Sequence, residues 1–165
     1  MGKILIITAM NDKNLSLAKD LQSLLSGMEQ QADIISLEDL HLPLFSNETK
    51  INEDLVAGLI EEVNSASGFI FCAPEYNGGV PPVLSNAIIW ISFQTKNWRD
   101  AFNGKFALIA THSSSSGQRF LTAFRSQLEY MGTNVLARTI SVTKEKPLKE
   151  DSVKRILQGL IDVIR

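Results

Sequence analysis

Proline and glycine are concentrated in one short stretch of the chain, together with residues that could contact a ligand. The stretch reads Pro74-Glu75-Tyr76-Asn77-Gly78-Gly79-Val80-Pro81-Pro82, a composition that excludes a regular helix or strand. Glycine lets a backbone approach a bound molecule closely, so residues 77–79 could present main-chain amides to it. The spacing alone is equally consistent with a proline-fixed connection that has a tyrosine lid and no ligand.

A second polar stretch, Thr111-His112-Ser113-Ser114-Ser115-Ser116-Gly117, precedes a predicted helix. Its small residues offer amides and hydroxyls that can bind an anionic group at a helix N-terminus. The imidazole of His112 could donate a proton. A flexible polar turn with a serine as helix N-cap explains the same residues equally well.

The turn after the first predicted strand lacks the glycine-rich signatures of nucleotide binding. It reads Thr8-Ala9-Met10-Asn11-Asp12-Lys13-Asn14, which excludes a G-x-G-x-x-G dinucleotide site and a P-loop. Helix capping by Asn11 or Asp12 is the simplest role for this turn. Four residues could instead supply amide, ammonium or hydroxyl donors to an anion at the helix N-terminus: Asn11, Lys13, Asn14 and Ser16.

The thiol and imidazole groups are too few to suggest metal or disulfide chemistry. One cysteine, Cys72, excludes an internal disulfide, and His41 and His112 are too far apart in sequence to indicate a His/Cys metal site. Cys72 lies within an apolar run, which indicates a buried small side chain rather than a redox thiol. We therefore expect that any chemistry here uses a borrowed cofactor or none.

Apolar runs of strand length alternate with helical periodicity along the chain, which is typical of a parallel sheet covered by helices on both faces. Strands are predicted over residues 3–8, 33–37, 68–73, 106–111 and 135–142. We expect one domain over residues 1–165, an α/β three-layer fold with the flavodoxin-like strand order 2-1-3-4-5. That order places ligands at the carboxyl ends of strands one, three and four, where the three loops lie. Response-regulator receivers share it, but they need an aspartate where this chain has Cys72-Ala73-Pro74.

Composition limits the possible partners. The chain has 165 residues, a net charge of −2 and a hydrophobic fraction of 44%, which suits one domain with a full core and no broad cationic face. We therefore expect neither nucleic acid nor a membrane as a partner. The apolar stretches are far shorter than the about 20 residues that span a bilayer, and no signal peptide is evident at the N-terminus. A cytoplasmic protein is expected.

Residues 73–92 read APEYNGGVPPVLSNAIIWIS and resemble the P-E-Y-N-G-x-x-P-x-x-L-K-N-A-x-D-W-x-S signature of the NADPH-dependent FMN reductases. The resemblance continues at Gly104-Lys105 and in the serine-rich loop that ends at Gly117. It implies a flavodoxin-like fold, FMN as cofactor, and NADPH or NADH as co-substrate. In the family, the segment that matches residues 74–79 borders the isoalloxazine ring and ribityl chain. Tyr76 would then pack near the flavin, and Glu75 would brace the loop.

The first loop departs from the family pattern. Family members usually carry G-S-x-R-x-x-S-x-N there, whose hydroxyls, arginine and helix N-terminus hold the FMN phosphate. This chain has Ala9-Met10 in place of Gly-Ser, has no arginine in the loop, and adds Asp12, which would repel a phosphate. The resemblance, with these departures, implies no catalytic side chain, no metal, and the following cofactor-binding residues: Asn11, Lys13, Asn14, Pro74, Glu75, Tyr76, Asn77, Gly78, His112, Ser113, Ser114 and Gly117.

The predicted helix over residues 83–93 is apolar in almost every direction around its axis. A helix on a sheet needs only one apolar face, so the surplus predicts self-association into a homo-oligomer. Family members commonly associate through this helix. The alternative is burial under the loop of residues 96–103.

The leading hypothesis is a flavoprotein oxidoreductase that binds FMN, takes hydride from NAD(P)H and reduces a small acceptor such as a flavin, a quinone or an azo compound. Arg119 and Arg125 are candidates for the 2′-phosphate of NADPH. The alternative hypothesis is a flavodoxin-like binding or regulatory protein with weakened or lost FMN binding. An electron shuttle is a third interpretation, weaker because such shuttles are usually more acidic.

Overall fold

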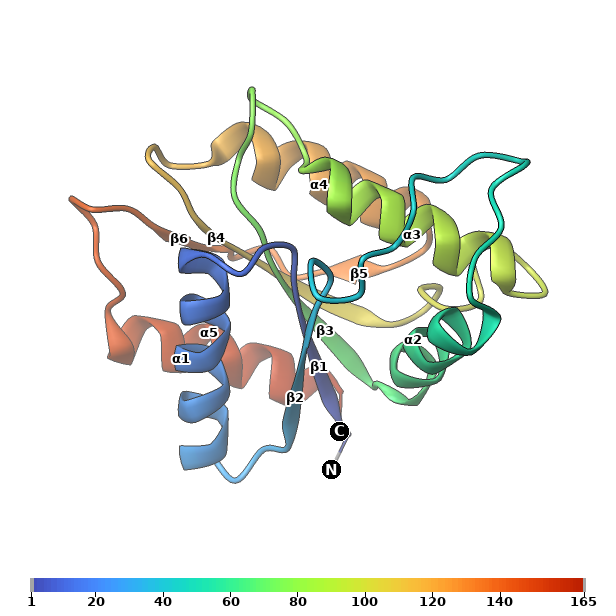
Figure 1. The fold of residues 1–165 in the computed structure, drawn as a ribbon. Coiled ribbons are helices and arrows are strands. Elements are labelled where there is room, and N and C mark those ends of the chain that lie inside the picture. The colour runs from blue at the N-terminus through green and yellow to red at the C-terminus, as the bar shows by residue number, and fades with distance from the viewer. Residues whose placement is uncertain (1, 165) are drawn as a thin grey trace.

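The computed structural model describes residues 2–164, whose apolar runs form the central parallel sheet (Figure 1). The strands follow one another at β1 (Ile4–Thr8), β2 (Ala32–Ser36), β3 (Gly68–Cys72), β4 (Phe106–His112), β5 (Asn134–Val135) and β6 (Ile140–Val142). The strand order is β2-β1-β3-β4-β5, with β6 also paired to β4, and every pair is parallel. The predicted order 2-1-3-4-5 is confirmed.

Within the described residues, five helices complete a three-layer arrangement (Figure 1). Helices α1 (Lys13–Gly27) and α5 (Glu150–Val163) cover one face, and α2 (Glu53–Ser65), α3 (Pro82–Gln94) and α4 (Gln118–Tyr130) cover the other. Alternate residues of a strand point to opposite faces, so β1 contributes Ile4 and Ile6 to the α1/α5 core and Leu5 and Ile7 to the other core. No helix within residues 2–164 is long and apolar enough to cross a membrane.

The predicted fifth strand over residues 135–142 is wrong as a continuous element, because the chain forms two short strands, β5 and β6, with a break between them. The Arg125 guanidinium of α4 donates hydrogen bonds to the carbonyls of Val135 at 3.2 Å and Leu136 at 2.6 Å. These carbonyls are therefore satisfied by a side chain from another element, and the edge of the sheet can bend between its two pieces.

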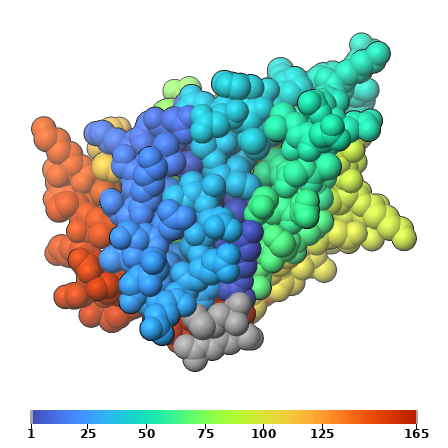
Figure 2. Space-filling model, turned by 60° about the horizontal axis from the view of Figure 1, so that its bottom comes forward, coloured from blue at the N-terminus to red at the C-terminus, as the bar shows by residue number. Residues whose placement is uncertain are grey.

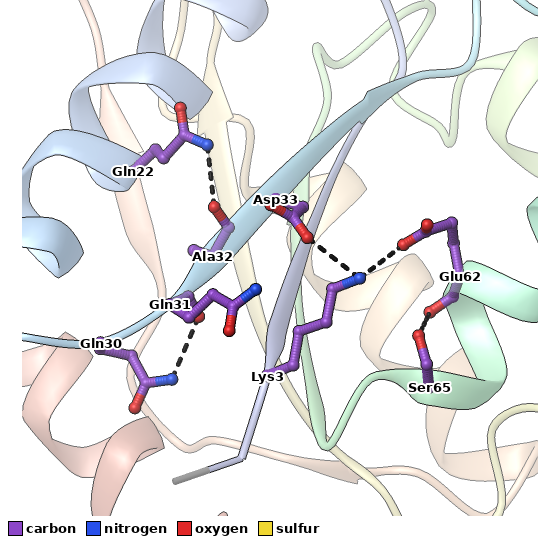
Figure 3. Close-up of polar contacts among 8 residues, drawn as sticks. All are labelled: Lys3, Gln22, Gln30, Gln31, Ala32, Asp33, Glu62 and Ser65. Carbon is purple, nitrogen blue, oxygen red and sulfur yellow. Dashed lines mark hydrogen bonds and ion pairs between the residues drawn. The ribbon is translucent and has the colours of Figure 1, made fainter.

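Polar contacts at the amino edge of the sheet tie β1, β2 and α2 together (Figure 3). The Lys3 ammonium lies 2.7 Å from the Glu62 carboxylate and 3.0 Å from the Asp33 carboxylate. Hydrogen bonds to Glu62 and then Asp33 raise the pKa of Lys3 above its ordinary value. This cluster lies at the edge opposite the loops that follow β1, β3 and β4, so its role is to hold elements together.

Candidate functional site

Three loops meet at the carboxyl edge of the sheet: residues 9–12 after β1, residues 73–81 after β3, and residues 113–117 after β4 (Figure 1). Backbone hydrogen bonds continue past the strand ends, from the Ala9 amide to the Cys72 carbonyl at 2.9 Å and from the Ala73 amide to the Ala110 carbonyl at 3.2 Å. The parallel register thus sets the starting point of each loop.

The tip of the β3–α3 loop is a tight turn. Asn77 and Gly78 both have positive φ, 50° and 71°, which is the conformation of a type I′ turn and favours an Asn-Gly pair. The turn is closed by a hydrogen bond from the Gly79 amide to the Tyr76 carbonyl at 2.9 Å. A Cβ at Gly78 would lie 3.0 Å from the Cδ of Arg119, so the turn rests directly on that arginine. Tyr76 is 45% exposed beside it.

Glu75 connects the β3–α3 loop to the β4–α4 loop. Its carboxylate accepts a hydrogen bond from the Phe120 amide of α4 at 3.0 Å, and its own amide donates to the Ser113 hydroxyl at 2.9 Å. That hydroxyl also lies 2.9 Å from the Thr111 hydroxyl. The two loops therefore form one continuous unit, here called the rim (residues 74–79 and 111–120), which Glu75 braces.

The N-terminus of α4 begins at a glycine and is capped by a side chain from another loop. Its N-cap residue is Gly117, which has φ 65° and makes no side-chain capping bond, so the alternative interpretation of a serine N-cap is wrong. The Glu75 carboxylate from the neighbouring loop satisfies the Phe120 amide instead. A Cβ at Gly117 would lie 2.7 Å from the Cγ2 of Thr111, so both the backbone angle and the space require glycine.

The Asn14 side chain forms hydrogen bonds with the backbone of His112. It is fully buried, its Oδ1 accepts a hydrogen bond from the His112 amide at 2.8 Å, and its Nδ2 donates to the His112 carbonyl at 3.1 Å. These two bonds fasten the start of α1 to the last residue of β4. His112 therefore belongs to the strand rather than to the loop that the sequence predicts.

Asn11 is held by the segment that follows β2. Its amide donates to the Glu38 carboxylate at 2.6 Å, its Nδ2 donates to the Asp39 carboxylate, and its Oδ1 accepts from the Ser36 hydroxyl at 2.6 Å. Asp12, and not Asn11, caps α1, because the Asp12 carboxylate accepts from the Asn14 amide at 2.7 Å. Figure 2 shows the segment after β2 (light blue to cyan) beside the start of α1 (blue).

Lys13 faces a different space. It lines a cavity of about 390 Å³ together with Ser16, His112 and Lys144, between α1 and residues 142–148. The structure thus does not gather the four candidate anion donors around one point: Asn11 contacts the end of β2 and Asn14 contacts β4, whereas Lys13 and Ser16 line this cavity.

The two candidate arginines differ in position. Arg125 is held at the start of β5 by the carbonyls described above and lies 3.6 Å from the Glu129 carboxylate. Arg119 packs against Gly78 in the rim. Of the two, only Arg119 is placed where a ligand on the rim could contact it.

Two residues of the signature have a role that their sequence positions alone did not predict. Asn86 and Trp90 of α3 both donate to the Pro43 carbonyl, at 3.0 Å and 2.8 Å, and the Asn86 side chain accepts from the Phe45 amide at 2.8 Å. They hold the connection between β2 and α2 onto α3. Their i, i+4 spacing, which places them on one helix face, is the signal that could have suggested a shared partner.

Cys72 lies at the end of β3 with no exposed surface. Burial raises the pKa of its thiol far above the usual range, which disfavours the reactive thiolate. The expectation of a buried small side chain is confirmed.

Residues 3–146 match the family described as NADPH-dependent FMN reductase. A relative from Mycoplasma pneumoniae, an uncharacterized protein, is 23% identical over 138 residues, 80% of each chain. An NAD(P)H-dependent FMN reductase from Schizosaccharomyces pombe is 29% identical over 101 residues, which are 61% of this chain and 44% of that protein.

Solved structures give the same fold. The flavoenzyme FerB, an NAD(P)H:acceptor oxidoreductase from Paracoccus denitrificans, superposes with a TM-score of 0.74 at 19% identity, covering 99% of this chain and 95% of that one. An archaeal flavodoxin superposes with a TM-score of 0.71 at 11% identity, covering 98% of both chains. The chain therefore belongs to the NADPH-dependent FMN reductase family and has the flavodoxin-like fold.

Proposed function

We propose that this protein is a flavin-dependent oxidoreductase that uses NAD(P)H to reduce a small acceptor such as a flavin, a quinone or an azo compound. The observation that carries the proposal is the Glu75 contact, which joins the two loops of the rim through the Phe120 amide and the Ser113 hydroxyl. A rim held in this way keeps its main-chain groups in fixed positions, as a preorganised binding surface requires.

The rim suits a planar ring that gains negative charge. A flavin that accepts hydride at N5 becomes anionic around N1 and the C2 carbonyl, and it needs hydrogen-bond donors along that edge. The exposed serines 114–116, which precede α4, offer hydroxyl donors for that edge. Tyr76 on one loop provides a partly exposed aromatic surface, and His112 is not required as an acid because solvent can protonate the ring.

The experiment is an NAD(P)H oxidation assay with purified protein and an added flavin, followed by absorbance of the nicotinamide and of the flavin ring. We expect flavin-dependent turnover in the wild type and a clear loss in Glu75→Ala, which removes the carboxylate contact to the Phe120 amide. The matched control is Glu61→Gln, an exposed residue of α2, which should retain turnover. If saturating flavin gives neither a change in ring absorbance nor turnover, the enzyme proposal fails.

A binding or regulatory protein is the second candidate, and the contacts of Asn11 support it. The amide of that residue already donates to Glu38, so a phosphate would have to displace a carboxylate. A protein of this kind would bind a ligand on the rim without oxidising NAD(P)H. A thermal shift with flavin but no turnover would favour it over the enzyme.

Self-association is also proposed, through an apolar surface here called the α3 patch (Leu44, Phe45, Ile89 and Phe93). Leu44 is 80% exposed, Ile89 41% and Phe93 65%, although Phe45 packs against the rings of Trp90 and Phe93. The loop of residues 96–103 leaves this surface exposed. We expect a homo-oligomer in sedimentation velocity, and a shift toward monomer in Phe93→Glu. A wild-type monomer at high concentration would contradict this.

A further inference from the structure

We propose that the site selects flavins by the charge of their side chain and binds riboflavin at least as tightly as FMN. The inference rests on the proposed function, because it concerns the same site, and it follows from the loop after β1. The residues present there do not fit the phosphate that the family name implies.

Three hydrogen-bond donors of this loop already face carboxylates within the protein. The Asn11 amide donates to Glu38 at 2.6 Å, the Asn11 Nδ2 donates to Asp39, and the Asn14 amide donates to Asp12 at 2.7 Å. The Asn14 amide is one of those that a phosphate at this helix N-terminus would need. The buried Asn14 side chain is held on both sides by the His112 backbone, so it is not available to turn toward a ligand.

The negative charge around the loop also disfavours a bound phosphate. Three carboxylates, from Asp12, Glu38 and Asp39, contact Asn11 or Asn14 directly. A phosphate monoester carries about −1.5 to −2 at neutral pH, so it would meet these carboxylates at close range. The cation of the loop, Lys13, lines the cavity that also contains His112 and Lys144, and the positions of the family arginine and Gly-Ser pair hold other residues.

Removing the phosphate removes the repulsion and leaves the rest of the flavin unchanged. The ring would still meet the rim, and the hydroxyls of an uncharged ribityl chain can donate to carboxylates such as Glu38 and Asp12. A carboxylate-lined loop therefore favours a polyol end over an anionic end.

The test compares riboflavin with FMN by quenching of flavin fluorescence on the wild-type protein, at about 0.01 M and about 1 M salt, where the Debye length falls from about 30 Å to about 3 Å. We expect riboflavin to bind as tightly as FMN or more tightly at low salt. Screening should then improve the affinity for FMN relative to riboflavin. A phosphate held by Lys13 would show the opposite salt dependence.

The variant Glu38→Gln removes one charge while keeping an acceptor for the Asn11 amide. Neutralising one charge close to a dianion should improve FMN affinity relative to riboflavin by about fivefold at low salt. Asp39→Asn is a second variant at an exposed position and should shift the ratio in the same direction. Glu61→Gln, remote on α2, is the matched control and should leave the ratio unchanged.

Two results would overturn the proposal: tighter binding of FMN than of riboflavin to the wild type at low salt, or no change in the ratio in both carboxylate variants. Each would leave flavin binding itself intact. The absence of quenching by either flavin would instead count against the proposed function. The two failures are therefore distinguishable.

Discussion

The rim and the loop after β1 meet at the same edge of the sheet, yet their polar groups are satisfied in different ways. In the rim, one carboxylate, Glu75, joins two loops and caps a helix. In the loop after β1, three carboxylates converge on Asn11 and Asn14. The rim also carries the family signature, and the other loop departs from it. The difference supports our proposal that the rim serves as the surface for a flavin ring and that the loop after β1 does not suit a phosphate.

The largest effect should come from filling the space under the rim. Gly117→Ala puts a Cβ where φ is 65° and where the Cγ2 of Thr111 would lie only 2.7 Å away. Left-handed strain and overpacking together should lower the free energy of unfolding by about 3 kcal/mol. Urea denaturation measures this loss.

The matched control for that change is Gly104→Ala. Gly104 has φ 77°, but no atom lies within 4 Å of the place where its Cβ would stand, so this variant keeps the strain and lacks the clash. It should cost about 1–2 kcal/mol. An equal loss in Gly104→Ala and Gly117→Ala would show that Thr111 yields without cost and that the rim is less rigid than its contacts indicate.

Asn14→Ala should remove the connection between the two regions. The change leaves the amide and carbonyl of His112 without the partner that now satisfies them, in a site where Asn14 is fully buried. The free energy of unfolding should fall by about 2–3 kcal/mol. Hydrogen exchange should also become faster at the His112 amide. Unchanged exchange there would contradict the role given to Asn14.

Substitutions of Glu75 test how the rim is held together, with a smaller expected loss of stability than Asn14→Ala. Glu75→Ala removes the acceptor for the Phe120 amide and should lower the free energy of unfolding by about 1–2 kcal/mol. Glu75→Gln keeps an acceptor and removes the charge at the start of α4, so its cost should be under about 1 kcal/mol. If both variants unfold like the wild type, Glu75 does not hold the loops together.

The smallest expected effect concerns Lys105, which lies outside both regions and makes the free energy of unfolding depend on pH. Its ammonium donates to the Val63 and Asn64 carbonyls at the end of α2, and burial lowers its pKa to about 8. The unfolded chain then binds more protons than the folded one between about pH 8 and the ordinary value of 10.5.

Lys105 should therefore contribute a rise in the free energy of unfolding across that pH range, by about 1 kcal/mol once solvent screening of this half-buried group is allowed for. Because the buried Cys72 thiol acts in the opposite direction, the rise is measured as the difference between the wild type and Lys105→Met at each pH. A difference that stays constant from about pH 8 to 10.5 would contradict the lowered pKa of Lys105.

The sequence predicts the elements of this fold well where local pattern decides them. Buried runs such as Ile4–Thr8 and Gly68–Cys72 and their order along the chain are sufficient to place the three loops at one edge. The Asn77-Gly78 pair likewise specifies its turn locally.

The features that sequence could not supply depend on contacts between distant residues. The break between β5 and β6 depends on Arg125, the cap of α4 comes from Glu75 in another loop, and the Asn11 amide pairs with Glu38 after β2. Each partner lies ten or more residues away along the chain, and local propensity does not report such contacts. The carboxylates around the first loop therefore become visible only in the folded structure.

Quenching of riboflavin fluorescence, titrated with the wild type and with Glu75→Ala, tests the central claim that the rim is the surface that holds a flavin ring. We predict saturable quenching by the wild type and by Glu61→Gln, and an affinity at least about tenfold lower for Glu75→Ala, as expected when a preorganised surface is disrupted. Equal affinity for all three proteins, or no quenching by any of them, would contradict this claim.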